Sequence, residues 1–141
     1  KEVVLGKDGV LEGAKPGTIL VDMSSIAPAT SIELCKAASE KGIEMLDAPV
    51  SGGEPKAIEG TLSIMVGGKL KTFLKVEGVL KSMGSSVVRV GESGSGNMTK
   101  LANQIIVALN IAAMSEAMVL AEKAGVDAEN VFNARTISDK P

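Results

Sequence analysis

Residues 94–125 read GSGNMTKLANQIIVALNIAAMSEAMVLAEKAG, a glycine loop that leads into one long helix-forming stretch. Asn97 is expected to cap the start of this helix, because its short side chain can accept a hydrogen bond from a free backbone N–H of the first turn. Gly125 is expected to end the helix by taking the left-handed conformation. About 27 residues lie between these signals, which corresponds to a helix of roughly 40 Å.

The middle of this stretch is apolar on nearly every face. Between Ile105 and Met114 the only polar residue is Asn110, so packing against one side cannot remove the apolar side chains from water. The only charge before Glu116 is carried by Lys100. We therefore expect other protein to cover this helix on several faces, either a second domain or a second copy of the chain in a homo-oligomer.

The composition excludes several classes of function. A chain of 141 residues with a net charge of −2 fits one ordinary domain and has no electrostatic reason to bind nucleic acid or an anionic membrane. The absence of histidine and the single cysteine, Cys35, rule out disulfides within the chain, Cys/His metal sites and Ser-His-Asp catalysis. The longest apolar run, Ile105 to Met114, is shorter than the roughly 20 residues that span a bilayer, so a soluble, cytoplasmic protein is expected.

Strand and helix patterns alternate before the long helix. Short runs rich in β-branched and aliphatic residues predict strands at residues 18–23, 43–50, 61–68 and 85–91. Helical spacing predicts helices from Pro28 to Gly42 and over 69–84, and Asp127 is expected to cap a final short helix. The first two strands and the helix between them form a βαβ unit, whose crossover implies parallel strands. The first part of the chain is therefore expected to be α/β, and the second part all-α.

Loops that follow the strands of an α/β sheet gather at one crevice, where ligands bind. Three such loops are expected here, at residues 22–28, 47–57 and 91–97. In the second loop Ser51, Gly52 and Gly53 offer a hydroxyl and backbone N–H groups that can converge on a carboxylate or phosphate oxygen. The alternative is a tight turn that needs glycine only for its backbone angles.

The first loop contains Asp22 and Ser25 at the end of the first strand. The serine hydroxyl can touch a ligand in the crevice, or these residues can cap the helix that follows. We favour the cap.

Lys100 and two amides follow the paired glycines at helical spacing. At about 100° per residue, Asn103 lies about 60° to one side of Lys100 and Gln104 about 40° to the other, so an ammonium group and an amide can face one small molecule. A lysine placed there can donate a proton to a carbonyl oxygen that is becoming an alcohol. The alternative is a solvated lysine near a helix start, where the helix dipole disfavours it.

Two long motifs closely resemble signatures of the β-hydroxyacid dehydrogenase family, the relatives of 3-hydroxyisobutyrate dehydrogenase and 6-phosphogluconate dehydrogenase. DAPVSGGEPKAIEGTLSIMVGG, at 47–68, resembles the family's substrate signature, and residues 94–126 resemble its catalytic helix. The resemblance covers about Lys1 to Ala134 and is nearest to the branch that acts on tartronate semialdehyde (2-hydroxy-3-oxopropionate). It implies that residues 1–93 are the later part of a Rossmann-type parallel sheet, without its first βαβ unit, and that 94–141 open a helical domain for substrate binding and dimerisation.

The resemblance also implies an activity, the reversible NADH- or NADPH-dependent reduction of tartronate semialdehyde to D-glycerate. 3-Hydroxyisobutyrate or another small β-hydroxyacid is the alternative substrate. By the same resemblance Ser51, Gly52 and Gly53 hold the substrate carboxylate, Lys100 is the general acid for the aldehyde oxygen, and Ser25 lies beside the nicotinamide.

The substrate-orienting amide is less defined by the resemblance. Many relatives carry an asparagine four residues after the lysine, whereas this chain has Gln104 there and Asn103 before it. Either amide is therefore a candidate to orient the substrate.

Two parts expected of the family are not in this sequence. No strand is followed by the G-x-G-x-x-G turn that grips a dinucleotide pyrophosphate, and most of the C-terminal helical domain is missing, with a divergent tail at 134–141. We therefore expect the middle of a longer enzyme, with little or no reductase activity in these 141 residues alone. The second hypothesis is a non-catalytic module that assembles through the long helix or by domain swapping.

Overall fold

The computed structural model describes residues 1–134. The chain divides into two compact units, Lys1–Ala102 and Asn103–Pro141, and most of the sequence's divergent tail lies outside the described residues. The first unit contains α1 (Glu2–Leu5), α2 (Val10–Gly13), β1 (Ile19–Asp22), α3 (Pro28–Glu40), β2 (Glu44–Asp47), β3 (Val50–Ser51), α4 (Gly53–Ile58), β4 (Ser63–Gly67), α5 (Leu70–Lys81) and β5 (Ser86–Gly91). The long helix α6 (Ser95–Lys123) begins in the first unit and continues into the second, which also holds α7 (Ala128–Ala134).

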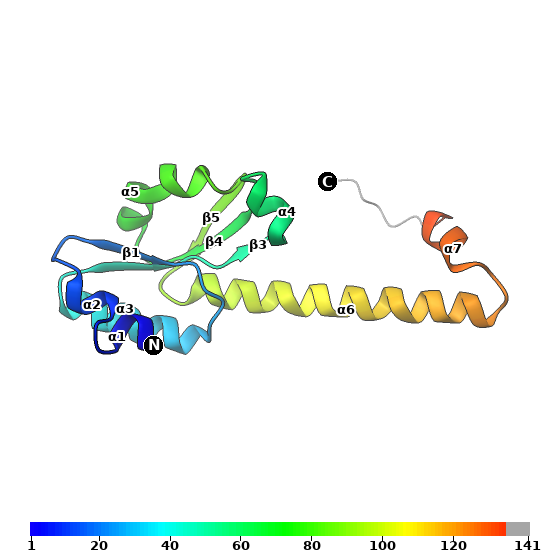
Figure 1. The fold of residues 1–141 in the computed structure, drawn as a ribbon, viewed down its shortest axis with the longest axis horizontal. Coiled ribbons are helices and arrows are strands. Elements are labelled where there is room, and N and C mark those ends of the chain that lie inside the picture. Colours follow the sequence, from blue (N-terminus) through cyan, green and yellow to red (C-terminus); the bar gives the residue numbers. More distant parts are fainter. Residues whose placement is uncertain (135–141) are drawn as a thin grey trace. The chain divides into compact units, whose positions relative to one another are not determined.

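The first two strands confirm the predicted βαβ unit. β1 and β2 pair in parallel from Ile19↔Glu44 to Asp22↔Asp47, and α3 connects them (Figure 1). α3 begins with Pro28 in its first turn, as expected, because proline lacks the N–H that this position leaves unpaired.

The strand predicted at residues 43–50 is divided into β2 and β3, with Pro49 in the gap between them. β4 pairs with both pieces in one antiparallel register, Asp47↔Gly67, Val50↔Ile64 and Ser51↔Ser63. The two pieces and β4 therefore form one hairpin whose connection contains α4.

This hairpin makes the sheet mixed, so the expectation of a wholly parallel sheet is wrong for β4 and β5. β4 runs opposite to β2, and β5 runs parallel to β4. A parallel return needs a crossover long enough to carry the chain back along the strand. The six residues of α4 span only about 9 Å at 1.5 Å per residue, so the chain returns directly beside the strand that it has just left. The expected α/β class with a Rossmann-type sheet is confirmed.

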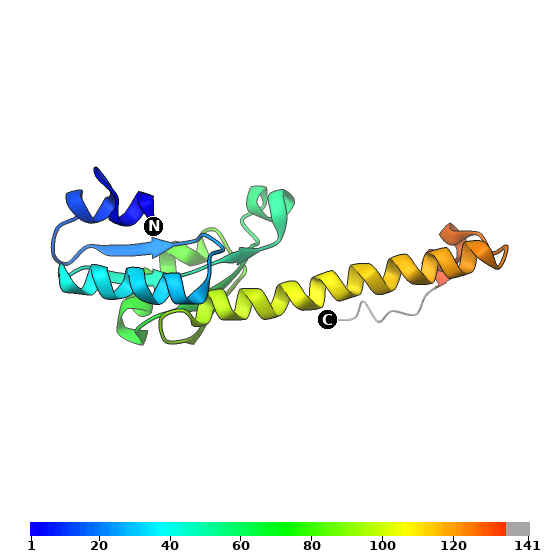
Figure 2. The same ribbon diagram turned by 90° about the horizontal axis from the view of Figure 1, so that it is seen from below.

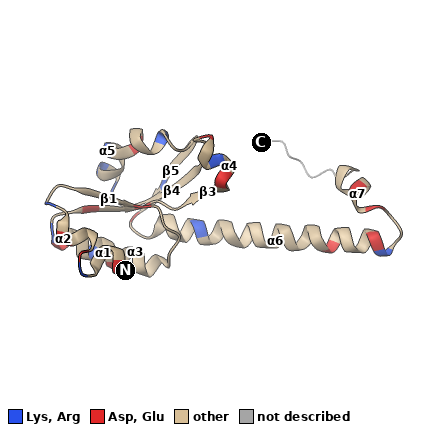
Figure 3. Ribbon diagram, in the orientation of Figure 1, with Lys and Arg blue, Asp and Glu red and all other residues tan. Residues whose placement is uncertain are grey.

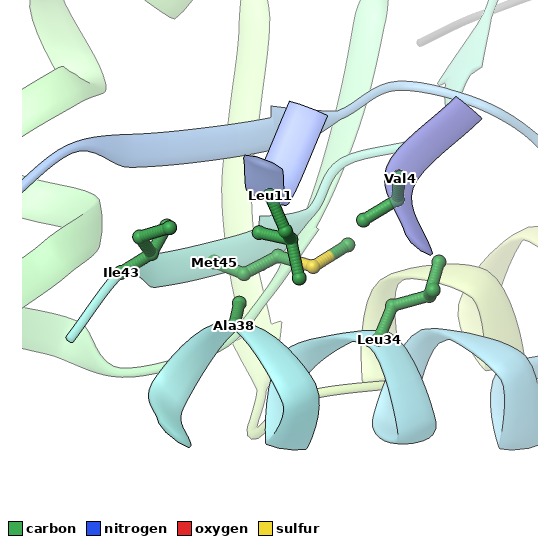
Figure 4. Close-up of a cluster of buried hydrophobic side chains, with 6 residues drawn as sticks. All are labelled: Val4, Leu11, Leu34, Ala38, Ile43 and Met45. Atoms are coloured by element: carbon green, nitrogen blue, oxygen red, sulfur yellow. The ribbon is translucent and has the colours of Figure 1, made fainter. Parts of the chain in front are cut away.

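Helices cover both faces of this sheet (Figures 1 and 2). Side chains alternate along a strand, so Met45 of β2 faces one side and Leu46 faces the other. Met45 packs with α1, α2 and α3 in a cluster of Val4, Leu11, Leu34, Ala38 and Ile43 (Figure 4). Leu46 packs with β4 and α5 in a second cluster of Ala48, Ile64, Val66, Phe73 and Leu80.

The end of α6 follows the sequence prediction. Gly125 has a φ of +79°, and the Val126 N–H donates to the Ala121 carbonyl oxygen at 3.0 Å, which is the Schellman pattern for a helix end. Asp127 then caps α7, because its Oδ1 accepts hydrogen bonds from the Glu129 and Asn130 N–H groups.

By length and composition α6 can cross a membrane. Its most apolar window has a mean hydropathy of 1.7, and none of that window is buried. The expectation that no part of the chain is long and apolar enough to span a bilayer is therefore wrong for this helix. One such helix is weak evidence for a membrane segment, because core helices of soluble proteins have the same composition.

Candidate active site

The first turn of α6 is held by a carboxylate from the sheet. Asp47, at the end of β2, is 2% exposed. Its Oδ1 accepts a hydrogen bond from the Gly94 N–H at 2.8 Å, and its Oδ2 accepts one from the Asn97 N–H at 2.9 Å. A negative side chain at a helix N-terminus satisfies free N–H groups and interacts favourably with the helix dipole.

Asn97 does not cap α6, so that prediction is wrong. Asn97 lies inside the helix and is 1% exposed, because the cap comes from Asp47, fifty positions earlier in the chain. Its side-chain amide instead links two other segments. Asn97 Oδ1 accepts a hydrogen bond from the Ile26 N–H at 3.0 Å, and Asn97 Nδ2 donates to Ser31 Oγ at 2.9 Å. The helix start is therefore tied to the loop after β1 and to α3.

Glycine lets the helix approach the sheet closely. A Cβ at Gly96 would lie 2.5 Å from the Met65 carbonyl oxygen and 2.6 Å from the Asp47 carbonyl oxygen. Gly94 has a φ of +90°, which is costly for other residues. The N–H groups of Gly94 and Asn97 already donate hydrogen bonds to Asp47. The glycines of this loop therefore allow close packing of the backbone against the sheet.

Lys100 is half-buried on α6, one turn after Asn97. Among the described residues no ion pair or hydrogen bond involves its Nζ atom. Figure 3 shows one basic segment near the start of α6 and acidic segments further along, and in the sequence Lys100 is the single basic residue of α6 before Glu116. Lys100 therefore has no partner among residues 1–134, and it lies near a helix start whose dipole is offset by the Asp47 carboxylate.

Ser25 is exposed in the loop after β1, and the predicted helix cap at this loop is wrong. Ala27 is the N-cap residue of α3 and makes no side-chain capping bond. Asp22 Oδ1 accepts a hydrogen bond from the Ser24 N–H at 3.0 Å, so that carboxylate shapes the loop. The Ser25 hydroxyl is left exposed next to Ile26, which binds the start of α6.

Ser51, Gly52 and Gly53 follow Asp47 at the end of β3. Gly52 has a φ of +137° and Gly53 a φ of +65°, so both need glycine for their backbone angles. This turn geometry is required whether or not the segment binds a carboxylate. The two glycines are exposed.

Asn103 and Gln104 belong to the second compact unit. Asn103 Nδ2 donates a hydrogen bond to Gln104 Oε1 at 3.3 Å, so the two candidate amides are paired with each other. Asn103 is half-buried and Gln104 is exposed.

The structure brings residues of all three predicted loops together, by a route that strand order did not predict. β5 runs opposite to β2, but the ends of the two strands are level in the sheet, because Asp47 pairs with Gly67 and Gly67 pairs with Gly91. The chain turns after Gly91, and the first turns of α6 run in the direction of β1 (Figures 1 and 2). The bond from the Ile26 N–H to Asn97 then joins the Ser25 loop to the helix turn before Lys100.

Comparison with known proteins identifies the family of this site. Residues 1–91 match the NAD binding domain of 6-phosphogluconate dehydrogenase, and residues 94–138 match the NAD-binding segment of NADP-dependent 3-hydroxyisobutyrate dehydrogenase. The chain belongs to the 3-hydroxyisobutyrate dehydrogenase-like family of β-hydroxyacid dehydrogenases. The resemblance of the two sequence motifs to this family is thereby confirmed.

Several β-hydroxyacid dehydrogenases are similar over nearly the whole chain. 2-Hydroxy-3-oxopropionate reductase of Escherichia coli is 47% identical over 95% of this chain, and 2-(hydroxymethyl)glutarate dehydrogenase of Eubacterium barkeri is 43% identical over 92%. The structure of 3-hydroxyisobutyrate dehydrogenase of Mycobacterium tuberculosis with L-serine superposes with a TM-score of 0.84 and 37% identity, over 92% of this chain and 45% of that one. The chain spans 46% and 43% of the length of the first two relatives.

Two segments of the site were expected near the dinucleotide that this family binds, the loop after β1 and the start of α6. A pyrophosphate needs convergent backbone N–H groups at a glycine turn, and residues 23–27, after β1, contain no glycine. The N–H groups at the start of α6 are occupied by Asp47. Neither of these two segments therefore fits a dinucleotide pyrophosphate.

Proposed function

We propose that the protein carrying this chain is an NAD(P)H-dependent reductase that converts tartronate semialdehyde to D-glycerate. The observation that carries this proposal is the 47% identity to a 2-hydroxy-3-oxopropionate reductase. The two family matches include the segment around Asp47 and the segment around Lys100. The named relatives act on different acids that share a carboxylate and a nearby carbonyl or hydroxyl group. A small β-hydroxyacid is therefore the substrate class, and tartronate semialdehyde is the member that we propose.

In the proposed mechanism the residues of this chain bind and protonate the substrate. The dinucleotide, when bound, supplies the hydride. The Ser51 hydroxyl and the N–H groups of Gly52 and Gly53 bind the substrate carboxylate, as oriented donors do for anions. Lys100 donates a proton from Nζ to the aldehyde oxygen, which gains negative charge as the carbon is reduced.

The other polar residues have supporting roles in this proposal. Asn103 or Gln104 orients the substrate through its amide, and Ser25 contacts the nicotinamide end of NAD or NADP. Lys100 is suited to proton donation because it is half-buried and has no partner among residues 1–134. A cytoplasmic location is part of the same proposal.

The test is NAD(P)H oxidation by the full-length protein with tartronate semialdehyde, compared with the oxidation of 3-hydroxyisobutyrate and 2-(hydroxymethyl)glutarate. Lys100→Met should lower kcat by about 100-fold or more, since a general acid contributes roughly 10²–10⁴-fold. Lys123→Met, at the other end of the same helix, is the matched control and should leave kcat unchanged.

Two results would contradict this proposal. One is wild-type kcat in Lys100→Met, and the other is no turnover of tartronate semialdehyde by the full-length protein. The 141 residues alone should oxidise little or no NAD(P)H, because their sequence contains no G-x-G-x-x-G turn to bind the dinucleotide pyrophosphate. NAD(P)H oxidation by the 141-residue chain that is lost in its Lys100→Met variant would contradict the expectation that this chain alone is inactive.

A second candidate function is supported by the exposed faces of α6. Ile105, Leu109, Ile111 and Leu120 are each more than 60% exposed. Apolar patches of this kind mark interfaces, so the helix is also suited to pair with a second copy of the chain. In this alternative the segment is a non-catalytic assembly module, and measurement of its mass in solution by light scattering tests the pairing.

A further inference from the structure

We infer that Asp47 is a positioning residue for the reaction, because its buried carboxylate fixes the helix turn that carries Lys100. The inference rests on the proposed role of Lys100 as general acid. It concerns a residue that does not itself reach the substrate.

Both oxygens of the Asp47 carboxylate accept hydrogen bonds from the protein backbone. Oδ1 accepts a hydrogen bond from the Gly94 N–H at 2.8 Å, and Oδ2 accepts one from the Asn97 N–H at 2.9 Å. Because the residue is 2% exposed, almost none of its surface is available for contact with a substrate. Asp47 therefore acts through the helix that it holds.

The packing around Asp47 leaves the helix little freedom to move. A Cβ at Gly67 would collide with Asp47 Oδ1 and would lie 2.7 Å from the Gly96 backbone nitrogen. A Cβ at Gly96 would meet the Asp47 carbonyl oxygen at 2.6 Å. Strands β2 and β4 thus form a close-fitting seat for the first turn of α6, with the carboxylate at its centre.

The same turn is fixed from the side by the Asn97 amide. Its bonds to the Ile26 N–H and to Ser31 Oγ tie the helix to the loop that contains Ser25 and to α3. Both Asn97 and Ser31 are 1% exposed, so water does not compete for these bonds. Asp47 and Asn97 together set the position of the α6 start relative to the Ser25 loop.

Lys100 is close enough to this seat to be affected by it. Lys100 follows Asn97 by three residues, or about 4.5 Å along the helix axis. A tilt of the first turn moves the lysine Cα, and a misplacement of about 1 Å can cost roughly 100-fold in rate. The long lysine side chain can correct part of such a shift, so loss of the Asp47 carboxylate should slow the reaction without abolishing it.

The experiment is a double-mutant cycle in the full-length enzyme. Asp47→Asn keeps the shape of the side chain but turns an NH₂ group toward one of the two backbone N–H groups. It should lower kcat about 10- to 100-fold with less than about 3-fold change in KM. In a Lys100→Met background, measured by single turnover so that residual rates remain visible, the same substitution should change the rate less than about 2-fold.

Non-additivity is the result that a merely structural role does not produce. If Asp47→Asn lowers the rate by the same factor in both backgrounds, or leaves kcat at the wild-type value, the inference is wrong. Asp127→Asn makes the same substitution at the start of α7, where Oδ1 accepts both capping hydrogen bonds, and is the matched control, with kcat expected at the wild-type value.

A second variant covers the case in which Asp47→Asn does not fold. Ser31→Ala removes only the acceptor of the Asn97 Nδ2 bond and should lower kcat by a smaller factor, again without effect in the Lys100→Met background. An additive or absent effect of Ser31→Ala then overturns the inference. Failure of the proposed function is a separate result, because in that case Lys100→Met alone retains wild-type kcat.

Discussion

Gly96 lies so close to the sheet that a Cβ has no room, and its missing side chain has a measurable consequence. Gly96→Ala places a methyl group 2.5 Å from the Met65 carbonyl oxygen, and backbone atoms cannot yield as a flexible side chain does. Overpacking of this kind costs typically about 1–3 kcal/mol. We expect Gly96→Ala to lower the free energy of unfolding by that amount, measured by urea denaturation of the first unit's signal.

The control for Gly96→Ala is a glycine with open space around it. A Cβ at Gly78, in the middle of α5, meets nothing within 4 Å. Gly78→Ala should therefore raise stability by roughly 0.5–1 kcal/mol, because alanine is the better helix former. If both substitutions change stability equally, close approach is not the reason for glycine at Gly96.

The sequence identified Lys100 and the glycines before it but missed the residue that holds them. Asn97 is a good capping residue by type, and local propensity therefore places it at the helix start. The actual cap is Asp47, which in the sequence is only an acidic residue that follows IEML in the predicted strand. The signal in the sequence is an acidic residue in a strand that is expected to be buried, with no Lys or Arg beside it. Such a carboxylate needs backbone N–H groups as hydrogen-bond donors.

At the scale of elements, an ion pair links β2 to α5. Lys75 Nζ lies 2.8 Å from Glu44 Oε2. The hydrogen bond and charge of Lys75 hold the pKa of the Glu44 carboxyl below its usual range. Because the pKa is lowered in the folded state, the stabilisation is present above the unfolded pKa and is lost as pH falls through the folded value.

Glu44→Gln should therefore destabilise the protein slightly at pH 7 and not at low pH. The difference in unfolding midpoint between wild type and Glu44→Gln should begin to shrink below about pH 4, near the ordinary pKa of a glutamate, and should vanish only below the lowered pKa of Glu44 in the folded state. It should also shrink in high salt, because the pair is exposed. Glu40→Gln is the control and should show neither dependence. A difference for Glu44→Gln that persists at low pH would exclude the ion pair as its cause.

Elements with local signals were predicted well, and strand direction was not. Pro28, Gly125 and Asp127 mark helix ends through their own backbone and side-chain chemistry, and the structure confirms each. The direction of β4 depends on where the chain returns after Gly53, which is a matter of pairing with β2 and β3. The spacing of apolar residues predicts a strand but not the direction in which it runs. The parallel sheet was therefore expected from the first βαβ unit alone.

At the scale of the whole molecule, the two units differ in how much they bury. The first unit has two apolar clusters on either side of the sheet. Among residues 103–134 no side chain is buried, although this part of α6 is mostly apolar. A helix of this composition needs a cover that the described residues do not provide, since isolated helices derive most of their stability from packing. Similar proteins of about twice this length have further chain that could form such a cover.

The 141-residue chain should therefore self-associate through α6. Leu109 is 65% exposed, and its burial against a second copy contributes about 1.5–3 kcal/mol. In a two-fold interface each such residue counts twice, so Leu109→Gln should weaken dimerisation by 100-fold or more, at roughly 1.4 kcal/mol per tenfold. Leu74→Gln, on α5 at 60% exposure, is the matched control and should leave the dimer intact. Light scattering over a range of concentrations measures both, and a wild-type chain that stays monomeric at tens of micromolar contradicts the pairing.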